Sequence, residues 1–159
     1  MPLNIKNVNY ENTNINIIGS THEEKKVFSN NDKCRQASSD ILNKLNKISP
    51  EVIFIELPSE EVNNISKFED ASPAYSSVEL VAVAKYISNK NVDVIGVDSK
   101  SLRELNQRDS SDEMINMSRL TRNNAIAYNT LIHLRENKIN NCVLIIGKNH
   151  MNEVIKILS

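Results

Sequence analysis

Apolar residues along this chain follow two alternating spacings, which predict strands and helices in turn. Short aliphatic runs predict strands at residues 14–18, 52–55, 92–97 and 142–146. Apolar residues three or four positions apart predict helices at residues 32–48, 76–88, about 100–108 and about 112–136, and a closing helix after His150 that ends at Leu158. Strands that alternate with helices favour an α/β fold with a mostly parallel central sheet and helices on both faces.

Two segments depart from this alternation. Residues 3–9 alternate apolar and polar positions before a turn at residues 10–13, so they predict an antiparallel N-terminal β-hairpin at the edge of the sheet. Residues 58–72 are acidic and are expected to form a loop, either a mobile flap or a small insertion. With 159 residues, the chain is expected to form a single domain over residues 1–159.

One short motif ends two of the predicted strands. Ile-Ile-Gly-x-x-His occurs at residues 17–22 and again at residues 145–150, and each glycine is interpreted as the turn that leaves the strand. The motif places His22 and His150, two of the three histidines, just beyond the carboxyl ends of their strands. Ligand sites of open α/β sheets gather at this edge. The two histidines are therefore expected to face each other although they lie far apart in sequence.

A carboxylate is expected at the same edge, because Glu56 follows the strand at residues 52–55. Two imidazoles and a carboxylate can ligate a divalent metal with a position left open for water, and the absence of cysteine from these motifs favours Mn, Co or Zn. Without a metal, Glu56 is expected to act as a general base toward water, with a neighbouring His or Glu as the acid. The alternative is that His22 and His150 only cap their loops. His133, on the long helix, is interpreted as structural.

Two further residues are candidates for the catalytic group. Arg122 follows Ile115 by seven positions and precedes Ile126 by four, so its stem lies along a partly apolar helical row. The helical row alone suits a guanidinium that reaches solvent or one that turns inward. Because the planar guanidinium fits a carboxylate with two hydrogen bonds, we expect it to point to the same edge and to pair with Glu56 or Glu79. Glu79 near the start of a predicted helix either joins the site or serves the helix dipole.

The run of acidic and basic residues at 23–26 also has two interpretations. It begins with Glu23 and Glu24, which either start a solvated helix or supply an extra catalytic carboxylate.

The bulk composition limits the partners. Net charge is −1 and the pI is about 6.3, which does not favour nucleic acid as a partner. Cys34 and Cys142 could form a disulfide, but two free thiols in a reducing compartment are favoured. The N-terminus lacks the layout of a signal peptide and no run reaches transmembrane length, so a cytoplasmic protein is expected. Only three glycines are present, without a Gly-rich phosphate loop.

The order of these motifs resembles the TraB/PrgY–Tiki superfamily, which shares the erythromycin-esterase-like (EreA/ChaN-like) α/β fold. Six segments carry the resemblance, from about residue 3 to the end: the two Gly-x-x-His motifs, the strand that ends in Glu56, Ser77 to Ala84, Val94 to Asp98, and Thr121 to Ala127. The chain departs from the family where Ser59 and Glu60 replace an arginine after the strand, and where Asp98-Ser99 replaces an Asp-Arg pair.

The resemblance implies hydrolysis, most directly of a peptide or protein. Tiki members are described as divalent-metal-dependent peptidases, whereas related toxin domains are considered metal-independent, and the erythromycin esterases hydrolyse a lactone. The expected activity is therefore a small peptidase centred on His22, Glu56 and His150. The alternatives are a metal-independent toxin-type endopeptidase, delivered into a host cell, and a non-catalytic module that sequesters a peptide or haem. The oligomeric state and the substrate stay open.

Overall fold

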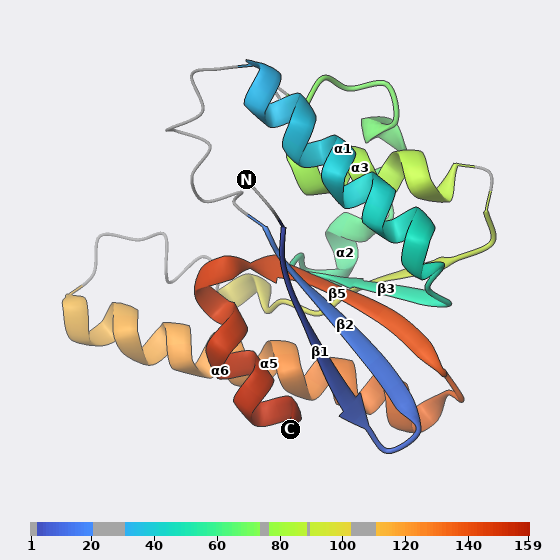
Figure 1. Cartoon of the computed structure of the whole chain (residues 1–159). Helices are drawn as coiled ribbons and strands as arrows, with labels where there is room; N and C mark the ends of the chain where they lie inside the picture. Colours follow the sequence, from blue (N-terminus) through green and yellow to red (C-terminus); the bar gives the residue numbers. More distant parts are fainter. Residues whose placement is uncertain (1–2, 21–30, 74–76, 89, 103–110) are drawn as a thin grey trace.

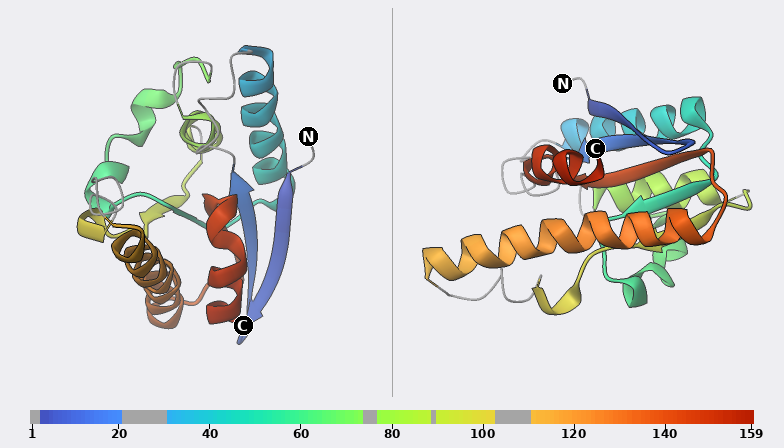
Figure 2. Two further views of the ribbon diagram at one scale, coloured as in Figure 1. Left: turned by 90° about the vertical axis from the view of Figure 1, so that its left-hand side faces the viewer. Right: turned by 90° about the horizontal axis from the view of Figure 1, so that it is seen from below.

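A computed structural model describes residues 3–20, 31–73, 77–88, 90–102 and 111–159, without the side chains of residues 31, 114 and 115. The described chain forms an α/β structure in which helices cover both faces of a five-stranded sheet (Figures 1 and 2). The strands are β1 (Asn4–Tyr10), β2 (Thr13–Ser20), β3 (Val52–Ile55), β4 (Asp93–Gly96) and β5 (Asn141–Gly147). The α-helices are α1 (Asn31–Ile48), α2 (Ser59–Val62), α3 (Val78–Ile87), α5 (Asp112–Glu136) and α6 (Met151–Leu158).

The sheet has the order β1-β2-β5-β3-β4, so the last strand of the chain lies at its centre. β5 pairs in parallel with β2 and with β3, and β3 pairs in parallel with β4. Only β1 is antiparallel, in the hairpin with β2 at the sheet's edge. This topology confirms the predicted fold, and it brings the carboxyl ends of β2, β5, β3 and β4 to one end of the sheet.

Alternate residues of the central strands enter two separate cores. Val52 and Phe54 of β3, with Leu144 of β5, face α5 and α6, whereas Ile53 and Ile55 face α1 and α3. A continuous aliphatic run is what a strand covered on both faces requires. His133 of α5 packs edge-on against Phe54, with ring centroids 5.4 Å apart, in agreement with its expected structural role.

Two local predictions were wrong. The acidic segment predicted as a loop contains α2 and a 3-10 helix η2 (Ile65–Phe68), because Val62 and Ile65 bury their side chains on the α3 side of the sheet. The motif glycines are not the turns that leave the strands, because Gly19 lies within β2 and Gly147 is the last residue of β5. Gly96 instead permits a close crossing of the chain, where a Cβ atom would lie 2.6 Å from the carbonyl oxygen of Leu57.

The two cysteines are free and lie in opposite cores. Cys34 packs in the core on the α1 side, and Cys142 packs in the core on the α5 side. A disulfide between them would require a path through the sheet. The expectation of two thiols is thus confirmed in the structure.

Candidate functional site

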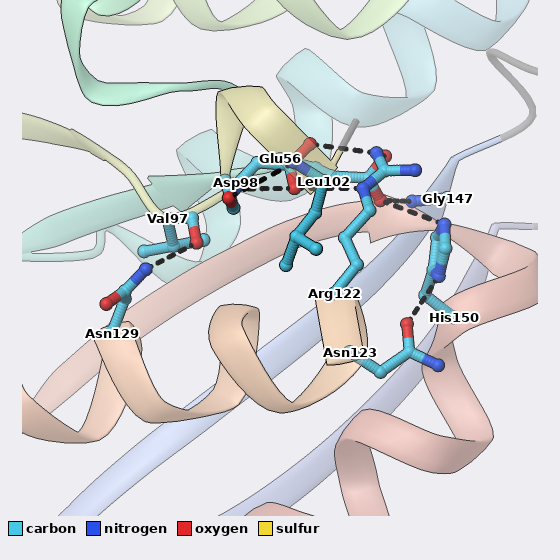
Figure 3. Close-up of polar contacts among 10 residues, drawn as sticks. Glu56, Val97, Asp98, Leu102, Arg122, Asn123, Asn129, Gly147 and His150 are labelled. Carbon is cyan, nitrogen blue, oxygen red and sulfur yellow. Dashed lines mark hydrogen bonds and ion pairs between the residues drawn. The ribbon is translucent and has the colours of Figure 1, made fainter. Parts of the chain in front are cut away.

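Four polar side chains converge at the carboxyl end of the sheet, from elements that are distant in sequence (Figure 3). Glu56 follows β3, Asp98 follows β4, His150 ends the 3-10 helix η3 (Lys148–His150) after β5, and Arg122 reaches them from α5. All four are buried. We call this group the charged cluster.

Glu56 is fixed by donors on both carboxylate oxygens. The backbone N–H of Gly147 donates to Oε1 over 2.9 Å, and Arg122 Nη2 donates to Oε2 over 2.8 Å. The backbone N–H of Glu56 donates to the carbonyl of Ile145, which extends the pairing of β3 with β5. The carboxylate therefore has one defined position beside the end of β5.

Arg122 joins two carboxylates through one planar guanidinium. Nε donates to Asp98 Oδ1 over 2.9 Å, and Nη2 donates to Asp98 Oδ2 over 2.8 Å as well as to Glu56. Such bidentate contacts are stronger and more directional than single ones. Asp98 Oδ1 also accepts from the N–H of Ser99. Arg122 thus turns inward, and its expected pairing with Glu56 is present.

His150 is oriented by Asn123. Its Nδ1 lies 2.6 Å from Asn123 Oδ1, which can only accept, so in a neutral imidazole the proton resides on Nδ1. Nε2 then presents its lone pair toward Glu56 Oε1, 3.8 Å away. In this tautomer Nε2 and Glu56 Oε1 are both acceptors, and a separation of 3.8 Å is one that a single donor or cation bound to both atoms would span.

Some of the predicted site residues lie in the charged cluster, and others lie outside the described residues. His150, Glu56 and Arg122 come together, as expected from the strand ends. His22, with Glu23 and Glu24, lies outside the described residues. β2, the strand that precedes His22, ends beside β5, with Ser20 paired to Gly147.

Glu79 lies in the first turn of α3, which packs against the core on the face opposite α5. The helix runs from the carboxyl end of β3 back to the start of β4, so its first turn is at the same end of the sheet as the charged cluster. Glu79 is buried, and the Oγ of the N-cap residue Ser77 accepts from Leu80 N. Both interpretations of Glu79, as a site residue or as a partner of the helix dipole, stay predictions.

Asn123, Asp98 and the Gly147 N–H were not expected as site components. Asn123 and Arg122 are consecutive and both lie on the buried face of α5. Polar residues at buried helical positions are the signal that could have identified Asn123. Asp98 ends its strand as Glu56 does, so the same strand-end argument applied to β4 would have included it.

The charged cluster has one negative charge in excess when His150 is neutral, because it contains two carboxylates and one guanidinium. That excess suits a cation, and Glu56 with His150 supplies a carboxylate and an imidazole of the kind that divalent metals bind. Within the described part of the chain, no three His, Cys, Asp or Glu side chains form a group that could hold a metal ion. The two described ligands therefore fit a divalent ion only if another donor, such as the predicted His22, joins them.

Comparisons of the chain with protein-family models, curated proteins and solved structures find no match. None of the helices in the described residues is both long and apolar enough to cross a membrane.

Proposed function

We propose that the protein is a small hydrolase, with a peptide bond as the favoured substrate, and that Glu56 and His150 activate the attacking water. The observation that carries the proposal is the facing pair of acceptors, Glu56 Oε1 and His150 Nε2, 3.8 Å apart. A water molecule between them can donate a hydrogen bond to each atom. Its oxygen would then point away from the pair, toward a bound carbonyl.

The neighbouring residues have positioning roles in this proposal. Arg122 and the Gly147 N–H hold Glu56 in the carboxylate form that can accept a proton. Asn123 keeps the His150 proton on Nδ1, so that Nε2 faces the water. After attack, Glu56 holds the proton and can pass it to the leaving amine.

A divalent metal is a second form of the same proposal. Glu56 and His150 would hold it together with His22, and the ion would supply Lewis-acid activation of water. Arg122, the Gly147 N–H and Asn123 would keep their positioning roles in this form, because each contacts Glu56 or His150.

The test is hydrolysis of a mixed peptide library by the wild-type chain and by Glu56→Gln. We expect a loss of about 10²–10⁴-fold in kcat/KM, because the amide cannot take a proton. Glu60→Gln, an exposed acid four residues later, is the matched control and should keep wild-type activity. Exhaustive chelation, followed by Mn, Co or Zn, separates the two forms: loss and recovery support the metal, and no change supports Glu/His catalysis.

Absence of hydrolysis in every condition would contradict the proposal, as would full activity of both His150→Ala and Glu56→Gln. A peptide-binding or haem-binding module should tolerate Glu56→Gln without loss of affinity. Thermal unfolding of each variant confirms that the comparison is between folded proteins.

A further inference from the structure

The outer face of α5 carries an apolar stripe with no cover in the described chain. Met117, Leu120 and Tyr128 are 63%, 55% and 65% exposed. They account for three of the four large apolar side chains that are exposed in the described residues; the fourth is Ile157 of α6. Single exposed apolar residues are ordinary, but three on one helical face call for a partner.

Helical geometry places seven residues along this face. Steps of three or four residues lead from Glu113 through Met117, Leu120, Asn124, Tyr128 and Leu131 to Arg135, and each step returns to the same side of the helix. Leu131 lies at the edge of this face, where it is half-buried against the core. Arg122 and Ile126, which are buried, point to the opposite side. We call this series the α5 stripe. In Figure 2, α5 lies at the margin of the ribbon, away from α1 and α3.

The α5 stripe is symmetric about Asn124. Glu113 and Arg135 lie eleven residues before and after it, Met117 and Leu131 seven, and Leu120 and Tyr128 four. An antiparallel copy of the helix, related by a two-fold axis at Asn124, would therefore set Glu113 against Arg135 and Leu120 against Tyr128. A surface that complements itself in this way is what an isologous dimer requires.

Charge along the helix favours the same arrangement. The first turn of α5 contains Asp112 and Glu113, and in the last turn Arg135 lies on the stripe with Glu136 next to it in the sequence. Antiparallel pairing sets Glu113 against Arg135 and aligns the helix dipoles favourably, whereas parallel pairing would set each of these charges against its own copy.

We propose that the α5 stripe is the interface of a homodimer, in which two copies of α5 pack antiparallel across Asn124. The charged cluster lies on the other side of each helix, so both copies of the site stay on the outer flanks of the helix pair. The contact is built around one helix pair of about 37 Å, so the dimer is expected to form at micromolar concentrations.

Sedimentation equilibrium of the full chain over about 1–200 µM tests the proposal. Leu120→Glu should weaken association by about thirtyfold or more, because it places a carboxylate in both halves of the apolar contact. Glu113→Arg and Arg135→Glu should each weaken it by about tenfold, and the double variant, which restores the opposite pairing, should regain most of the affinity. Wild-type protein that is monomeric at every concentration would overturn the proposal.

Cysteine cross-linking tests the register. Asn124→Cys sits on the proposed axis and should form an intermolecular disulfide on mild oxidation, since the native thiols are buried. Asn116→Cys, an exposed asparagine on the same helix eight residues away, should not. Equal cross-linking of the two variants, or a dimer that survives Leu120→Glu unchanged, would show that another surface forms the contact.

Discussion

The two ends of the central sheet both tie strands to helices with polar side chains, but they use different chemistry. At the amino end the buried polar side chains are neutral: Asn16 Nδ2 donates to Asn141 Oδ1 and to the Cys142 carbonyl, and Thr13 Oγ1 donates to the Ile139 carbonyl. Asn141 Nδ2 also donates to Ile48, the last residue of α1. At the carboxyl end, two carboxylates meet one guanidinium.

The difference indicates which end has a role beyond stability. Neutral amides satisfy buried backbone groups at low cost, since their desolvation is repaid by the hydrogen bonds that they form. Buried charges lose far more hydration, and well-packed apolar residues often stabilise a fold as well or better. A fold that needed only a fastening at the carboxyl end could use amides there too. The contrast supports the catalytic role proposed for the charged cluster and a structural role for the amino-end amides.

The largest effect on stability is expected for Arg122→Met. The variant leaves Glu56 and Asp98 buried without their shared cation, so the free energy of unfolding should fall by about 3–5 kcal/mol. Arg122→Lys keeps the charge but loses the planar contacts, so its free energy of unfolding should lie between those of the wild type and Arg122→Met. Urea unfolding followed by circular dichroism measures both. An unchanged midpoint for Arg122→Lys and Arg122→Met alike would mean that the guanidinium is not held inward.

A smaller loss is expected at the amino end. Asn141→Ala removes the acceptor of Asn16 and the donor to the α1 carboxyl end, and should cost about 2 kcal/mol by the same urea measurement. Its kcat should stay at the wild-type value, because the residue lies at the far end of β5. A drop in kcat without a loss of stability would contradict the division between the two ends.

The sequence predicted the sheet and the meeting of Glu56 with His150 because both depend on one rule, that parallel strands end together. It left the direction of Arg122 open, since an arginine in a partly apolar helical row suits both solvent and core. Asn123 was missed because asparagines are frequent throughout this chain, so one more carried no signal. The amino-end amides were missed for the same reason: Asn16 reads as the polar residue of an alternating strand until its partners are known.

A triple variant separates stability from chemistry at the charged cluster. Glu56→Met, Asp98→Leu and Arg122→Met together remove all three charges and leave no carboxylate unpaired. Its free energy of unfolding should lie within about 2 kcal/mol of the wild type, although the Gly147 N–H loses its acceptor. Hydrolysis should nevertheless be abolished. A triple variant less stable than Arg122→Met alone would show that the charges are needed for the fold itself.

The smallest effect concerns Cys142, at the amino end of the sheet, and it develops above pH 9. Burial, with a lesser contribution from the Glu51 carboxylate, raises the pKa of the thiol from 9.0 to about 12. Between these values the unfolded chain releases the proton while the folded chain keeps it. The thiol's contribution to stability is therefore complete below pH 9 and is lost as the pH rises toward 12.

At pH 10 the free energy of unfolding should be about 1 kcal/mol lower than at pH 8 because of this thiol. Cys142→Ala, compared with wild type by urea unfolding at both pH values, should lack this loss of stability, whereas Cys34→Ala retains Cys142 and should show it. Identical pH dependence in all three proteins would mean that folding does not raise the pKa of the Cys142 thiol.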